Sequence, residues 1–310
     1  MYAELTGRKN RKNLGIKSPK GNKCDNIFDS DPLLQRSKDR GWYTSCDGGK
    51  DINQPLLYAA TTAAGSYNPT DTLDTTDNAQ FTAAVYDWKY YYANISVTRA
   101  DELKNSGDSQ ILNFVQQKVK AAEMSLKDSL QDGIYSDGTT ASDIGGLALI
   151  VDAGNTVGQI AQGTYSWWQA QEDSSTTTLS LDAMQTTYNA QTIDGSSPTV
   201  IMATRANYNR YYALLQPQQR FMDAKTAKGG FQSLMFNGTP LIAGSKVTAN
   251  HLYFLNEEFL HLYYHPKEDF RTEPFQKPVN QAVQLAKVFW AGNLGTSNAR
   301  MQGKLSAVTA

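Results

Sequence analysis

Two histidines in the stretch HLYYH have a spacing that, on a helix, could hold a metal ion. His261 and His265 are four residues apart, so a helix would place both imidazoles on one face. The segment alternates like a strand, however, and it ends at Pro266. On a strand the two side chains point the same way about 13 Å apart, too far to share one ion. We therefore expect no metal site at these histidines.

The acidic stretch DTLDTTD raises the same question for calcium. Asp71, Asp74 and Asp77 follow one another at every third residue, and the glycine of an EF-hand loop is missing. Gly, Pro and Asn are dense around them, which predicts a solvated turn. We expect no cofactor and no metal here.

Motifs that cradle phosphate or activate a nucleophile do not occur in the sequence. It contains no G-x-x-x-x-G-K, G-x-G-x-x-G or G-x-S-x-G element. The adjacent Trp167 and Trp168 would face opposite ways on a strand, one filling core and one anchoring an interface; two core positions in an irregular loop are the alternative. The sequence thus offers no visible active site, which argues against an enzyme.

Composition and charge point to contacts between proteins. Charged residues make up 19% of the 310 residues, and the chain contains 17 Tyr and 5 Trp. A surface that is poor in charge and rich in these aromatics is typical of interfaces, although an ordinary neutral domain is the alternative. The longest apolar run, Leu147 to Val151, is far shorter than the roughly 20 residues of a membrane span. Cys24 and Cys46 match no metal or redox spacing and are expected to be free thiols.

The first 23 residues are basic and lack apolar periodicity, which predicts an extended arm. Their only acidic residue is Glu4. The arm could contact nucleic acid or an acidic partner chain, or could simply be solvated. Its basic residues are Arg8, Lys9, Arg11, Lys12, Lys17, Lys20 and Lys23.

A long hairpin and a long helix follow the arm. PLLYAATT and AQFTAAVYDWKYYYANISVTR flank a turn-rich tip, and a hairpin of this length must lie on its own domain or on a neighbouring chain. A helix is predicted over 109–132, with Asp108 or Ser109 as N-cap and Gly133 as its stop. Its apolar stripe consists of Ile111, Val115, Val119, Ala122, Leu126 and Leu130.

The remaining elements make the fold class α+β. A second helix is expected to start near Ser180, SPTVIMAT is a short buried strand, and RANYNRYYALLQ is a helix directly after it. The rest is mostly strand, with an Asn-Gly turn in FNGTPLIAG. VFWAGNLGTSNARMQGKL predicts a strand that runs into a Gly-Asn turn and a second strand from Arg300 onward.

The order of these parts resembles the major capsid protein of tailed double-stranded-DNA bacteriophages, the Hong Kong 97 capsid fold shared with encapsulin shells. The similar stretches run from about Asp51 to the C-terminus. They include YDWKYYYANISVTRADELKNSG, ILNFVQQKVKAAEMSLKDSLQDGIYSDGT, GTYSWWQAQ, PTVIMATRANYNRYYALLQ, FNGTPLIAGSKVTANHLYFLN and VFWAGNLGTSNARMQGKL.

The resemblance implies a domain plan. Residues 1–50 would be the N-terminal arm, 51–98 the E-loop hairpin, and 99–195 the P-domain with the spine helix at 109–132. Residues 196–279 would form the A-domain, and 280–310 the strands that return to the P-domain. The apolar face of the return strand is expected to pack on Val115, Val119 and Leu126.

It also implies a structural protein whose copies form pentamers and hexamers and close into an icosahedral head around DNA, with no catalysis. Further implied partners are a scaffolding protein or domain, a portal, a decoration protein and non-specifically bound DNA, with assembly in the host cytoplasm. The expected interface residues are Arg8, Lys9, Arg11, Lys12, Tyr67, Asp71, Asp74, Trp88 and Trp168.

One variation of the family concerns covalent cross-links between subunits, made by an E-loop lysine. No lysine occurs between Lys50 and Lys89, which predicts a shell without cross-links. Two alternatives remain. One is an encapsulin-like compartment, and the other is an unrelated soluble enzyme or binding protein built around the histidines or the aspartates.

Overall fold

A computed structural model describes residues 31–104, 114–215 and 234–308. The helices are α1 (Pro32–Arg40), α2 (Arg99–Lys104), α3 (Phe114–Ile134), α4 (Leu147–Ile150), α5 (Leu181–Gln191) and α6 (Arg205–Leu215). The strands are β1 (Tyr43–Ser45), β2 (Ile52–Leu57), β3 (Phe81–Tyr86), β4 (Lys89–Thr98), β5 (Thr156–Val157), β6 (Ile160–Ala161), β7 (Gln171–Asp173), β8 (Val200–Ala203), β9 (Met235–Phe236), β10 (Thr239–Ala243), β11 (Leu252–Leu255), β12 (Leu260–Tyr264), β13 (Arg271–Thr272), β14 (Val283–Thr296) and β15 (Gly303–Leu305). Helices and sheets are mixed along the chain, and the α+β prediction is confirmed.

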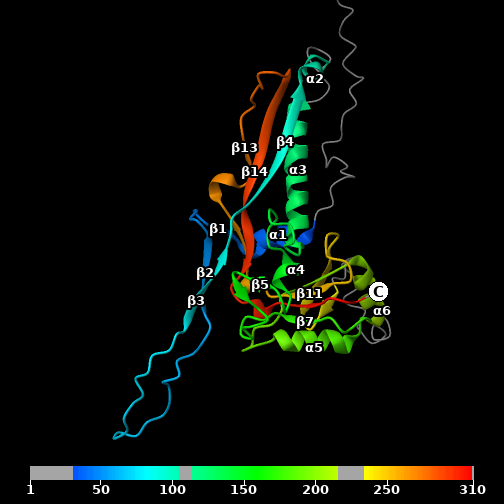
Figure 1. Ribbon diagram of the computed structural model, residues 1–310. Coiled ribbons are helices and arrows are strands. Elements are labelled where there is room, and N and C mark those ends of the chain that lie inside the picture. The colour runs from blue at the N-terminus through cyan, green and yellow to red at the C-terminus, as the bar shows by residue number, and fades with distance from the viewer. Residues whose placement is uncertain (1–30, 105–113, 216–233, 309–310) are drawn as a thin grey trace, which may run out of the picture.

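The long strand β14 organises one sheet. It pairs antiparallel with β4, β12 and β13, and β12 in turn pairs parallel with β1. Helix α3 runs alongside β4, so that helix and strands together form the elongated upper part of the molecule (Figure 1). Gly133 is needed near the end of α3 because a Cβ atom there would collide with the Tyr91 hydroxyl.

The second sheet has six strands in the order β7-β15-β11-β8-β10-β9. Helices α5 and α6 lie at this end of the molecule (Figure 1). The Ser180 side chain caps α5 by accepting a hydrogen bond from the amide of Ala183 at 3.1 Å. Asn237 and Gly238 have positive φ in the β9–β10 turn, which suits these residue types. The predicted α5 start, the β8–α6 unit and the Asn-Gly turn are all confirmed.

Strands β2 and β3 pair with each other alone and form a hairpin that projects away from both sheets (Figure 1). The returning stretch is not one continuous strand. It breaks at Asp87 and Trp88, after which β4 joins β14. The hairpin and the long sheet are therefore separate elements, joined by residues 46–51 between β1 and β2 and by Asp87 and Trp88 between β3 and β4.

The segment predicted as the N-terminal arm, residues 1–50, is described from Asp31 onward. From Asp31 onward the segment is folded onto the body, because Asp31 caps α1 and Leu33 and Leu34 are buried in the main core. Strand β1 then pairs with β12. Residues 1–30, including most of the arm, lie outside the described residues.

The predicted Gly-Asn turn near the C-terminus is wrong. Strand β14 passes through Gly292 and Asn293 and ends at Thr296. Gly292 serves close packing, since a Cβ there would collide with the carbonyl oxygen of Tyr263 and the ring of Trp290. The last strand, β15, belongs to the six-stranded sheet, so the C-terminal stretch joins both sheets.

The predicted packing of the return strand on α3 holds only in part. Leu126 shares the main core with Val288 and Trp290 of β14, and Val119 packs at the edge of that core. Val115 is 39% exposed, so the prediction was wrong there. The reason is that β4 is the main strand along α3. The predicted caps Asp108 and Ser109 lie outside the described residues.

Candidate assembly interface

The β2–β3 hairpin has two apolar faces. On the inner face, Ile52 lies opposite Tyr86, and both are buried with Leu56 and Ala84. This face packs on the β5–β6 turn, where the amide of Val85 donates to the carbonyl of Gly158 at 3.0 Å. The inner face therefore docks the hairpin on its own chain.

The outer face of the hairpin has no cover within the described chain. Leu57 and Phe81 lie directly opposite each other and are 68% and 74% exposed. Pro55 and Ala83 form the next exposed pair on the same face. Alternate residues of a strand face opposite sides, so the apolar residues Phe81 and Ala83 that alternate in the sequence are the ones that point outward.

The β4–β14 ladder shows the same division. On its inner face Tyr91 lies opposite Trp290, and the two rings meet edge to face at 5.9 Å. Burial raises the pKa of Tyr91 to about 12, so its hydroxyl stays neutral while it accepts a hydrogen bond from the amide of Ile144. Ile95 and Val97 continue this buried face toward the end of β4.

The outer face of this ladder is aromatic and basic. Tyr90 and Tyr92 are 71% and 69% exposed, and Tyr92 lies opposite Phe289 of β14. Phe289 in turn lies opposite Arg271 of β13, and the exposed Lys287 follows on the same face of β14. An exposed aromatic patch rimmed by polar residues marks an interaction site.

The tip of the hairpin, residues 58–80, carries three of the predicted interface residues. Tyr67 is 66% exposed, and Asp71 and Asp74 are exposed as well. Hydrogen bonds from Thr76 hold the pKa of Asp74 below its usual range, so this carboxylate stays charged. The tip is therefore accessible and acidic.

The two tryptophans of the predicted interface behave differently. Trp88 is half-buried, with its indole N–H donating to the carbonyl of Gly49 at 3.1 Å. Trp168 is 1% exposed and fills the core, where its indole N–H donates to Val157, so it has no surface to offer a neighbour. Trp167 is the more accessible of the adjacent pair and stacks on Tyr58 of the hairpin. Arg8, Lys9, Arg11 and Lys12 lie outside the described residues.

The candidate metal residues are not brought together. His261 lies on β12 and contacts the Ser297 hydroxyl, whereas His265 accepts a hydrogen bond from the amide of Lys267. Over residues 31–104, 114–215 and 234–308, no group of three His, Cys, Asp or Glu side chains could hold a metal ion. In the same ranges no helix is long and apolar enough to cross a bilayer, and Cys46 is a free thiol.

Sequence reasoning missed the exposed residues Leu57, Tyr90 and Tyr92 and the half-buried Phe289. The alternating tyrosines of KYYYAN carried a signal, because a half-buried strand must expose every second one. The sequence did not show which of these tyrosines face outward, because Tyr90, Tyr91 and Tyr92 are the same residue type.

Comparison of the whole architecture with solved structures gives a consistent result. A chain of the cyanophage A-1(L) capsid asymmetric unit matches with a TM-score of 0.70 and 16% identity, over 93% of this chain and 96% of the other. Mycobacterium phage Bobi matches at 0.60 and 11% identity, over 93% of both chains. The chain has the Hong Kong 97 capsid fold.

An encapsulin shell protein has the same fold, whereas the searches with the sequence found no match. The SrpI encapsulin of Synechococcus elongatus PCC 7942 shows the same fold, with a TM-score of 0.59, 10% identity and coverage of 93% of this chain and 92% of its own. No protein-family model matches the sequence, and no curated protein matches it. The β2–β3 hairpin with its tip and α3 fall in the stretches predicted above as the E-loop and the spine helix, and the hairpin with its tip is called the E-loop below.

Proposed function

We propose that this chain is the major capsid protein of a tailed bacteriophage, which assembles as pentamers and hexamers into an icosahedral head around double-stranded DNA. The observation that carries the proposal is the pair of uncovered apolar faces, one on the E-loop and one on β4–β14, in a chain with a shell-forming fold. Leu57, Phe81, Tyr90 and Tyr92 expose more apolar surface than an isolated domain needs, and neighbouring copies supply the cover.

The role is structural, and its chemistry is assembly. Many weak contacts of this kind add up through the geometry of a closed shell, so no single interface needs to be strong. The basic first 23 residues suit an assembly contact or non-specific contact with packaged DNA. A scaffolding protein or domain, a portal and a decoration protein complete the proposed set of partners in the virion, after assembly in the host cytoplasm.

The proposed shell is held together without covalent cross-links. The E-loop has no lysine between Lys50 and Lys89, and Lys89 itself is engaged at the loop root, where its ammonium donates to the carbonyl of Ala141 at 2.7 Å. Boiled particles should therefore run on a denaturing gel as a single band near 34.2 kDa. A covalent ladder would contradict this part of the proposal.

An encapsulin-like compartment is the second candidate, and the match to the SrpI encapsulin favours it. The two functions differ in what the particle contains. Double-stranded DNA in particles from the native source supports the capsid, and protein cargo in place of DNA supports the compartment.

Negative-stain electron microscopy of the overexpressed chain tests self-assembly. Closed shells or tubes are the expected result. A monodisperse monomer at all concentrations, with or without a co-expressed scaffold, would overturn the proposal.

A further inference from the structure

On the β3 side, the E-loop meets the long sheet at a short junction. Strand β3 ends at Tyr86 and β4 begins at Lys89, so only Asp87 and Trp88 lie between the hairpin and the long sheet on this side. The two ladders share no strand. The direction in which the E-loop leaves the body therefore depends on what holds this junction, together with the packing of the hairpin's inner face.

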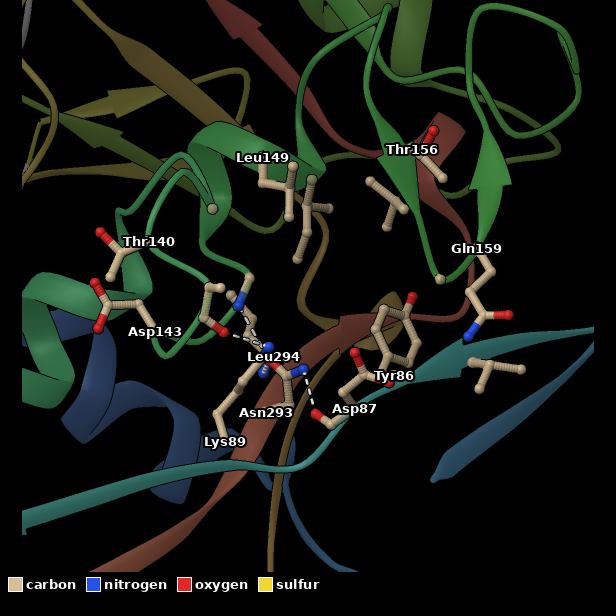
Figure 2. Close-up of a pocket in the computed structure, with 17 residues that line it drawn as sticks. Tyr86, Asp87, Lys89, Thr140, Asp143, Leu149, Thr156, Gln159, Asn293 and Leu294 are labelled. Atoms are coloured by element: carbon tan, nitrogen blue, oxygen red, sulfur yellow. Dashed lines mark hydrogen bonds between the residues drawn. The ribbon is translucent and has the colours of Figure 1, made fainter. Parts of the chain in front are cut away.

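Asn293 of β14 holds the junction through its side-chain amide. The Nδ2 group donates to the carbonyl oxygen of Asp87 at 2.7 Å, as Figure 2 shows. The Oδ1 atom accepts hydrogen bonds from the amides of Gly145 and Leu294 at 3.0 and 2.9 Å. Asn293 is 4% exposed, so water cannot readily replace these partners. One side chain thus ties together the E-loop root, the loop after α3 and β14.

Tyr86 provides a second tie one residue earlier. Its hydroxyl donates to the carbonyl of Thr296 at 2.8 Å and accepts from the amide of the same residue at 3.0 Å. Gly295 makes room for the ring, because a Cβ at that position would lie 2.9 Å from it. Both ties connect the junction to the last residues of β14.

Open space lies beside the junction. A cavity of about 260 Å³ is bounded by Asp87 and Lys89 at the E-loop root, by the 138–145 loop, by the β5–β6 turn and by Asn293 (Figure 2). Packing therefore does not fill this side of the junction. The inner face of the hairpin packs on the body farther along, where the Gln54 side chain also accepts a hydrogen bond from the Tyr263 hydroxyl at 2.6 Å. At Asp87 itself, the restraint comes from the hydrogen bonds of Asn293 and Tyr86.

We propose that Asn293 is a latch that fixes the angle between the E-loop and the body, with the Tyr86 hydroxyl as its second point. Asn293 is a positioning residue, which acts through the backbone of Asp87. The consequence for particle size rests on the proposed capsid function, because the E-loop would reach a neighbouring subunit at that angle. The restraint on the junction does not depend on that function.

The variant Asn293→Asp tests the latch in the unassembled chain. Aspartate keeps an oxygen that accepts from Gly145 and Leu294, but it replaces the donor to Asp87 with a second acceptor. Hydrogen exchange at the amides of β2 and β3 should become roughly tenfold faster, since one buried hydrogen bond of the junction is lost. Unchanged exchange in the hairpin would overturn the proposal.

A pair of tyrosine variants keeps the test decisive if the buried charge at 293 unfolds the chain. Tyr86→Phe removes the hydroxyl bonded to Thr296, and Tyr253→Phe removes a buried hydroxyl bonded to Thr248 in the other sheet. The latch predicts faster hairpin exchange for Tyr86→Phe alone. Equal behaviour of the two variants would mean that the Tyr86 hydroxyl has only a general structural role, and would overturn the proposal.

Particle size distinguishes this inference from the proposed function. In electron micrographs, Asn293→Asp or Tyr86→Phe should give a broader distribution of particle diameters than the wild type. Wild-type diameters together with unchanged exchange would overturn the latch and leave the capsid function standing. Wild-type chains that form no shells would overturn the capsid function, while the exchange result would still decide the latch.

Discussion

The six-stranded sheet and the β4–β14 ladder are both built from apolar strands, but only the sheet has strands, β8 and β11, that are covered on both faces. All four residues of β8 and of β11 are buried, and they alternate between two apolar clusters. Ile201 and Phe254 face the cluster that includes α5 and α6, whereas Met202 and Tyr253 face the main core. In β4–β14 the core covers only the inner face, and Tyr90 and Tyr92 remain exposed.

The difference separates residues that fold the chain from residues that assemble it. The side chains of β8 and β11 bury their apolar surface against other parts of the same chain, so they stabilise the monomer. On the outer faces of the E-loop and of β4–β14, the large side chains Leu57, Phe81, Tyr90 and Tyr92 stay mostly exposed in the single chain. Their apolar character stabilises only a state in which another chain covers them.

The largest expected effect is the loss of assembly when a charge is placed on an outer face. Phe81→Asp should abolish shell formation while changing the free energy of unfolding of the monomer by no more than about 0.5 kcal/mol, because Phe81 is 74% exposed. Particle yield by sedimentation and denaturant unfolding measure the two effects. Thr186→Asp, at an exposed position on α5, adds the same charge and should assemble normally. Normal shells from Phe81→Asp would contradict the claim that the outer face of the E-loop is needed for assembly.

A substitution in the six-stranded sheet should instead affect the stability of the monomer. Phe254→Ala should lower the free energy of unfolding by about 3–5 kcal/mol, since it leaves a cavity where the side chain was fully buried. Urea unfolding of the unassembled chain checks this. A loss below about 1 kcal/mol would show that the sheet is not covered by its own chain in solution.

The docking of α1 can be tested at a half-buried ion pair. Arg36 makes two bonds to the carboxylate of Glu257, at 2.6 and 2.8 Å, and Glu257 is 6% exposed. Arg36→Met should cost about 3 kcal/mol because it leaves that carboxylate without its cation. The double variant with Glu257→Gln should recover part of the loss in urea unfolding. An additive loss would contradict a direct pair.

The smallest expected effect is a pH dependence in the half-covered sheet. Burial lowers the pKa of His261 from its ordinary value near 6.5. Just below pH 6.5 the unfolded chain therefore binds more protons at this residue than the folded chain, and stability falls as the pH falls. His261→Gln should remove this part of the slope of Tm between about pH 7.5 and 5.5. An unchanged slope would mean that His261 does not contribute.

Local signals in the sequence predicted the elements that depend on near neighbours. The Ser180 cap, the buried β8 strand before α6 and the Asn237–Gly238 turn all follow from residues within a few positions of one another. The order of these parts was also enough to indicate the fold. Each of these features is set by backbone preferences that tertiary contacts do not overrule.

Long-range contacts explain what the sequence did not predict. Gly292 and Asn293 look like a turn, yet they continue a strand because Tyr263 packs against one and the E-loop junction binds the other. The two faces of the hairpin are both apolar, so alternation alone could not tell which one is buried. Trp167 and Trp168 are adjacent and identical in type, so the sequence does not show that Trp168 is the buried one; the folded loop sets the direction of each ring.

A cryo-electron microscopy reconstruction of the assembled particle tests the central claim most directly. It should show Leu57 and Phe81 of each E-loop, together with Tyr90 and Tyr92 of each long sheet, in contact with neighbouring copies of the chain. A particle in which both outer faces point into solvent in every copy would contradict the account.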